Sequence, residues 1–136
     1  MKMLFTLALL TSVFSVHASL LPKFDVKCAE NYWNDPQQAQ LENIKDVLET
    51  REITEADIKA GIATKEHLGA NYAEKTYKIG AMKVVAQVFV ENLSLRITLP
   101  DGTYIFSGNE GKRTQLGAFI NDDFSHHSIH CSMVKK

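Results

Sequence analysis

Apolar and polar residues alternate with a period of two along much of the chain, most clearly in its second half. The segments that show this period are residues 72–79, 93–99, 104–107, 114–120 and 129–133. Successive side chains of a β-strand point to opposite faces, so the period predicts strands. Residues 82–90 are apolar at nearly every position, which indicates a strand covered on both faces, or on one face with a partner element. Gly80 and Pro100-Asp101-Gly102 supply turns, and together these signals predict an antiparallel meander of five to six strands.

A helical period precedes the meander. Four apolar residues recur at helical spacing: Leu41, Ile44, Val47 and Leu48. They would form one apolar stripe along a helix. Asp35 followed by Pro36 is typical of a helix start, because aspartate caps the first turn and proline fits the first helical position. We therefore expect a main helix over about 36–51.

Two shorter helical turns should follow this helix. Thr54 can cap a helix, and Asp57 stands at the reciprocal position of a capping box. Gly61 suits the end of such an element. Residues 64–69 have a similar pattern and predict a further single turn.

This order of elements predicts an α+β fold: an N-terminal strand, the main helix, short helical turns, and a curled antiparallel sheet on which the helix packs. The order resembles the arrangement of cystatins, as an analogy of fold alone. The inhibitor motif of that family is Q-x-V-x-G. The segment from Gln87 to Glu91 has Phe89 where the motif has valine and Glu91 where it has glycine. The resemblance therefore implies neither the inhibitory activity nor its residues here.

The two cysteines lie near opposite ends of the chain, each in an alternating segment. Cys28 shares a face with Phe24 and Val26, and Cys131 shares a face with Ile129 and Met133. Both should point inward. We expect the first and last strands to be neighbours, joined by a Cys28–Cys131 disulfide, and the alternative is two buried free thiols.

Composition narrows the class of protein. Of the 136 residues, 45% are hydrophobic and 23% charged, which is too apolar for a disordered chain and suits one domain. The net charge of -1 argues against a general nucleic-acid binder, because that class needs a basic footprint.

The N-terminus is typical of an export signal. Lys2 precedes an apolar run, and Val16-His17-Ala18 places small residues before a cut at Ser19. We expect a signal peptide at 1–18 and a single domain at 19–136, secreted or periplasmic, with no transmembrane segment after cleavage. The alternative is an uncleaved membrane anchor.

Three histidines gather near the C-terminus: His126, His127 and His130. Imidazole suits copper or zinc, so a metal site or a catalytic use of these rings is one hypothesis. On a strand, however, His126 and His130 would stand about 13 Å apart, too far to share one ion. A solvated strand face is the alternative. Pairing a histidine with Asp122 or Asp123 and a nearby serine would give a hydrolase, but there is no nucleophile-elbow motif in the chain.

Four aromatic residues are candidates for a partner surface: Trp33, Tyr72, Tyr77 and Tyr104. Tryptophan and tyrosine dominate binding hot spots. The leading hypothesis is a small exported binding or inhibitor-type domain that is not an enzyme and needs no cofactor. Its partner would be a protein or a component of the cell envelope. A structural envelope protein is a further alternative.

Overall fold

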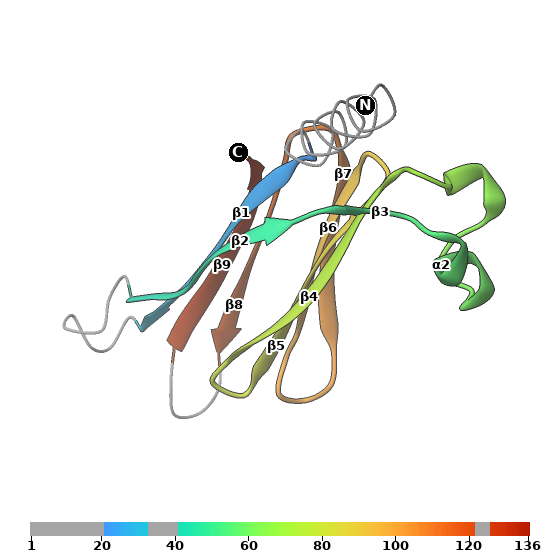
Figure 1. Ribbon diagram of the computed structural model, residues 1–136. Coiled ribbons are helices and arrows are strands. Elements are labelled where there is room, and N and C mark those ends of the chain that lie inside the picture. The colour runs from blue at the N-terminus through green and yellow to red at the C-terminus, as the bar shows by residue number, and fades with distance from the viewer. Residues whose placement is uncertain (1–20, 33–40, 122–125) are drawn as a thin grey trace, which may run out of the picture.

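The computed structural model describes residues 21–32, 41–121 and 126–136. These residues form two antiparallel sheets that face each other (Figure 1). The four-stranded sheet has the order β2-β1-β9-β8 and comprises β1 (Lys23–Tyr32), β2 (Leu41–Glu49), β8 (Arg113–Asn121) and β9 (His126–Lys135). The five-stranded sheet follows chain order and comprises β3 (Arg51–Glu52), β4 (Asn71–Ile79), β5 (Met82–Phe89), β6 (Asn92–Thr98) and β7 (Tyr104–Glu110).

The core lies between the two sheets and follows from the period of two. The inward residues of β5 are Met82, Val84, Ala86 and Val88, all buried. The inward residues of β6 are Leu93, Leu95 and Ile97, also buried. Phe24, Val26 and Met133 of the opposite sheet belong to the same buried cluster. Removing each such side chain from water is worth about 1.5–3 kcal/mol. The segments predicted as strands are strands, but the single curled sheet expected for them is wrong, because β8 and β9 pair in the four-stranded sheet.

The expected α+β fold with a main helix over 36–51 is wrong. Residues 41–49 form β2, which pairs antiparallel with β1, and residues 36–40 lie outside the described residues. Ile44 and Leu48 are both buried, and their spacing of four residues fits one face of a strand as well as one face of a helix. Val47 lies on the other face and is 38% exposed. Because the main helix is missing, the resemblance to the cystatin arrangement does not hold.

The sheets are connected at both sides. On one side the chain passes from β2 through Thr50 directly into β3, so it moves from one sheet to the other almost without a break (Figure 1). On the other side β7 leads into β8, and the hydroxyls of Ser107 and Thr114 lie 2.9 Å apart across this connection. The result is a sandwich of two sheets in which the chain connects the edge strands β2 and β3 on one side and β7 and β8 on the other.

Helical structure within the described ranges is confined to the excursion between β3 and β4. It comprises α2 (Glu55–Lys59) and a 3-10 turn at Lys65–His67, both near the sequence-predicted positions. The Thr54 N–H donates to Asp57 Oδ2 at 2.8 Å, as expected for the capping box. At the other end, Gly61 takes φ 79, which lets the Ile62 N–H reach the Asp57 carbonyl.

One turn carries backbone strain. Val90 lies between β5 and β6 with φ 59, a left-handed conformation that β-branched residues rarely adopt. Its N–H donates to the Asn71 carbonyl at 2.8 Å, which holds the turn against the start of β4.

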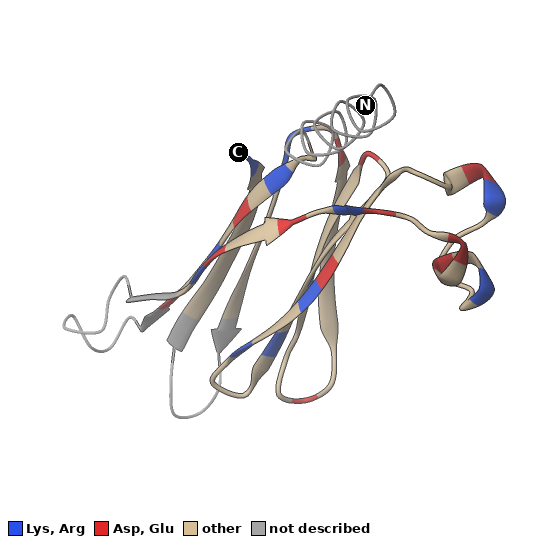
Figure 2. Cartoon of the chain, in the orientation of Figure 1, with Lys and Arg blue, Asp and Glu red and all other residues tan. Residues whose placement is uncertain are grey.

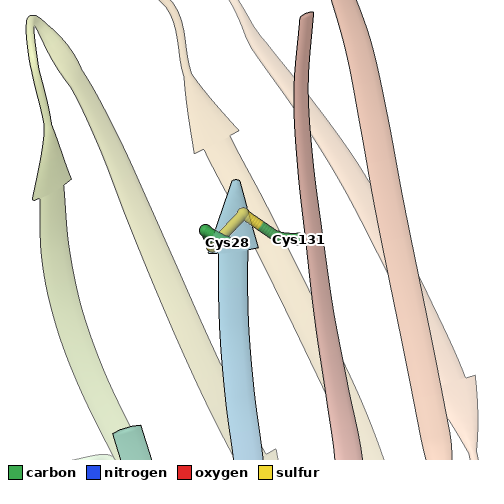
Figure 3. Close-up of a disulfide and its surroundings, with 2 residues drawn as sticks. All are labelled: Cys28 and Cys131. Carbon is green, nitrogen blue, oxygen red and sulfur yellow. A yellow bond between two sulfur atoms is a disulfide. The ribbon is translucent and has the colours of Figure 1, made fainter. Parts of the chain in front are cut away.

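The expected disulfide is confirmed. Cys28 and Cys131 are direct partners in the register between β1 and β9, with Cα atoms 4.1 Å apart (Figure 3). Both residues are buried and point into the core. The first and last strands are thus neighbours linked covalently at the centre of their sheet. No helix in the described part of the chain is long and apolar enough to cross a bilayer.

Candidate functional site

The outer face of the five-stranded sheet presents a regular grid of side chains. The register aligns Glu74, Gln87, Ser94 and Gly108 in one row across β4, β5, β6 and β7. The preceding row contains Tyr72, Phe89, Asn92 and Glu110, and the following row contains Thr76, Val85, Arg96 and Phe106. A row of small and polar side chains therefore lies between two rows that carry aromatic rings.

This middle row forms the floor of a trough. Two hollows of about 570 and 450 Å³ adjoin each other and share Gln87, Ser94 and Phe106 in their lining. The trough runs across the strands, so it spans roughly 15 Å over four strands. It is open and shallow, and it suits an elongated ligand better than a small enclosed one.

Phe106 and Tyr104 form one wall of the trough. They are 61% and 63% exposed, which is high for aromatic side chains on a sheet. The Phe106 ring lies over Gly108, where an added Cβ would be only 3.0 Å from it. The Arg96 guanidinium lies 5.6 Å from the centroid of the Tyr104 ring. Arg96 is exposed, and the ion pairs of the described residues do not include it.

The opposite wall is an aromatic cluster that continues into the α2 excursion. The Phe89 ring contacts Tyr72 edge-on at 6.4 Å between centroids and His67 at 4.9 Å. The Arg51 guanidinium lies 5.0 Å from the Tyr72 centroid, so Tyr72 contacts both Phe89 and Arg51.

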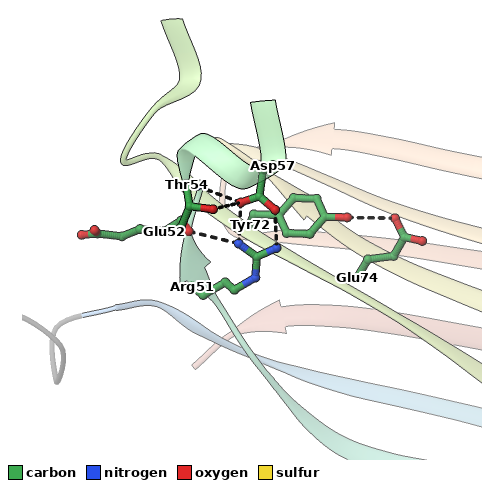
Figure 4. A network of polar contacts seen from close by, with 6 residues as sticks. All are labelled: Arg51, Glu52, Thr54, Asp57, Tyr72 and Glu74. Atoms are coloured by element: carbon green, nitrogen blue, oxygen red, sulfur yellow. Dashed lines mark hydrogen bonds and ion pairs between the residues drawn. The ribbon is translucent and has the colours of Figure 1, made fainter. Parts of the chain in front are cut away.

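An ion pair anchors this wall (Figure 4). Arg51 donates two hydrogen bonds to the carboxylate of Asp57, at 2.7 and 2.8 Å, and a bidentate pair of this kind is geometrically specific. Hydrogen bonds from Arg51 and from the Thr54 backbone hold the pKa of Asp57 far below its ordinary value. The bridge ties β3 to the start of α2.

The same network reaches the floor of the trough. The Tyr72 hydroxyl donates to Glu74 Oε2 at 3.3 Å, and Gln87 Nε2 donates to the same oxygen at 3.0 Å. Burial raises the pKa of Tyr72, and the nearby Glu74 carboxylate raises it further. Glu74 and Gln87 are thus held in place before any ligand arrives.

A second hollow, of about 780 Å³, lies where β2 runs past β4. Lys75 lines this hollow and donates from Nζ to Asp46 Oδ2 at 2.8 Å, and the Tyr77 hydroxyl donates to the same oxygen at 2.7 Å. Lys75, and then Tyr77, lower the pKa of Asp46, while burial and Asp46 raise the pKa of Tyr77. These three groups satisfy one another and join β2 of one sheet to β4 of the other.

The aromatic residues expected from sequence have different surroundings. Tyr104 on β7 lines the trough, whereas Tyr72 on β4 lines the hollow between β2 and β4. Tyr77 packs against the core and donates to Asp46, away from the trough. Trp33 lies outside the described residues.

The three histidines belong to β9, where the register pairs His126 with Asn121, His127 with Ile120 and His130 with Gly117. The strand predicted for this segment is therefore present, and along it four residues span about 13 Å. His130 is exposed. Asp122, Asp123 and Ser125 lie outside the described residues.

Sequence reasoning missed Phe106, Gln87, Ser94 and Arg96. One signal was available: Tyr104-Ile105-Phe106 is an unbroken apolar run in a short strand, so one of its faces must leave large apolar groups outside the core. The polar row could not be assembled without the strand register.

We compared the chain with known protein families, curated proteins and solved structures. No protein family, no curated protein and no solved structure matches the chain.

Proposed function

We propose that the chain is an exported, non-catalytic binding domain whose ligand lies on the outer face of the five-stranded sheet. The observation that carries the proposal is the exposure of Tyr104 and Phe106 beside polar side chains that are already oriented. Aromatic side chains dominate binding energy where they meet a partner. Burying two of them against a ligand is favourable, because their rings need little further ordering.

Two acids with lowered pKa values, Asp57 and Asp46, support binding over catalysis. Asp57 is occupied by Arg51 and Asp46 by Lys75 and Tyr77, and each contact joins two elements of the fold. A general acid or base needs a pKa near the working pH, whereas these contacts lower the pKa of both carboxyls, away from neutral pH.

Export is supported by the Cys28–Cys131 disulfide, since such bonds persist in oxidising compartments, and by the signal-like pattern at residues 1–18. Intact mass of the chain recovered from its native medium or envelope tests this directly. We expect a mature chain that begins at Ser19, and a chain that keeps residues 1–18 in the reducing cytosol would contradict export.

Binding is tested by retention of native medium and envelope components on the immobilised chain. Wild type should retain a component that Tyr104→Ala and Phe106→Ala lose. Phe119→Ala is the matched control, because Phe119 is an aromatic residue 76% exposed on β8 of the other sheet. Equal retention by all four proteins, or turnover in a broad hydrolase screen, would overturn the proposal.

A further inference from the structure

The chemistry of the trough is polar at its floor and aromatic at its walls. Gln87 and Ser94 can both donate and accept hydrogen bonds, Glu74 accepts, and Arg96 donates. Phe106 and Tyr104 offer exposed apolar ring surface beside them. A ligand that fits must therefore carry many groups that donate and accept at once, together with apolar C–H surface.

We propose that the trough binds a neutral oligosaccharide chain, an inference that rests on the binding function proposed above. Hydroxyl groups of a sugar both donate and accept, which matches the amide and hydroxyl of the floor. The C–H faces of sugar rings pack on exposed aromatic rings, here Phe106 and Tyr104. The chain would lie across the strands, over Glu74, Gln87 and Ser94, and would meet the Phe106 ring that covers Gly108.

Charge favours a neutral ligand. The lining of the trough holds two carboxylates, Glu74 and Glu110, and one guanidinium, Arg96, so it carries no excess of positive charge that would favour a polyanion. Figure 2 shows Lys and Arg interspersed with Asp and Glu over the described strands, with no continuous basic stripe. A polyanion such as nucleic acid gains its affinity from such a stripe.

Geometry argues against an extended peptide. Peptides that add to a sheet pair with the backbone groups of an edge strand. The trough instead crosses the face of the sheet, where the backbone groups of β5 and β6 are already paired on both sides. A ligand there can contact only side chains of the sheet and not its backbone groups, which disfavours a peptide added as a strand.

The test is isothermal titration of the disulfide-bonded mature chain with neutral hexasaccharides of glucose, mannose, galactose or N-acetylglucosamine. At least one should bind. Phe106→Ala and Tyr104→Ala should each weaken that binding by about tenfold or more, and Phe119→Ala should leave it unchanged. Gln87→Ala keeps both aromatic rings and should also weaken binding, which separates loss of the site from loss of the cover over Gly108. Urea midpoints close to that of wild type establish that the variants are folded.

Three results would overturn the inference. The first is that no hexasaccharide in the panel binds. The second is binding confined to a sulfated hexasaccharide, which would mean that charge, through Lys78 and Lys83 in the row of Tyr104, contributes more than ring contacts. The third is a dimer in light scattering that Phe106→Ala dissociates, which would make the face a contact between two copies. If envelope or medium proteins are retained through Tyr104 and Phe106 while all sugars fail, this inference falls and the binding function stands.

Discussion

The disulfide closes nearly the whole described fold, and its removal should be costly. Cys28 and Cys131 are separated by 103 residues in sequence. In the chain-entropy treatment, closing a loop of this size restricts the unfolded chain by about 4.7 kcal/mol. Native disulfides of small exported domains are worth about 2–5 kcal/mol when measured, so we expect a loss of about 4 kcal/mol from the unfolding free energy.

Urea unfolding of three forms of the mature chain separates the link from its packing. Oxidised and reduced wild type differ only in the bond, whereas reduced wild type and Cys28→Ala/Cys131→Ala differ only in two buried sulfurs. The first difference should be about 4 kcal/mol. The second should be smaller, at about 1–2 kcal/mol, because little apolar volume is removed.

The unfolded state offers an independent check. A bridged unfolded chain is more compact, so the oxidised form should show a smaller denaturant slope than the reduced form. Equal slopes combined with a difference below about 1 kcal/mol would refute the argument that the bond stabilises by restricting the unfolded chain. Two alkylatable thiols in the denatured, unreduced chain would refute the bond itself.

Three further outcomes are expected. The carboxylate of Asp57 has a lowered pKa, so its contribution to stability is full above pH 3.8 and is lost at lower pH. In urea unfolding at decreasing pH, the difference in unfolding free energy between wild type and Asp57→Asn should therefore shrink. A difference that stays constant would contradict this. Tyr77 has a raised pKa, so above pH 10.0 the unfolded chain alone loses this proton; Tyr77→Phe should lose stability less steeply with rising pH than wild type. Val90→Asn should gain about 1 kcal/mol by relieving the left-handed backbone, whereas Val85→Asn, at an extended position, should lose stability in the same thermal melts.

Local pattern was sufficient where one face of a strand is buried and the other is wet. In β6 apolar and polar residues alternate strictly, and in β5 nearly every position is apolar; each segment was found from sequence within a residue or two. The capping residues around α2 were equally readable, because a cap uses neighbours three residues apart. The pairing of Cys28 with Cys131 followed from two inward faces and an even count.

Local pattern failed for β2. A spacing of four residues, as between Ile44 and Leu48, fits both the helical period and the period of a strand. Pairing with a neighbouring strand therefore decides which of the two forms. That partner is β1, whose residues pair with β2 through a register shift between Cys28 and Ala29. The signal peptide expected at 1–18 stays a prediction, since it lies outside the described residues.

The sequence by itself determined the strands of the meander, the short helical turns and the covalent link between the ends of the domain. Each depends on residues close together in the chain, or on a single pair of cysteines. The tertiary structure alone decided that the strands form two sheets and that Glu74, Gln87, Ser94 and Gly108 share a row. Both depend on which strands pair and in what register, and a shift of one residue would turn that row into the core.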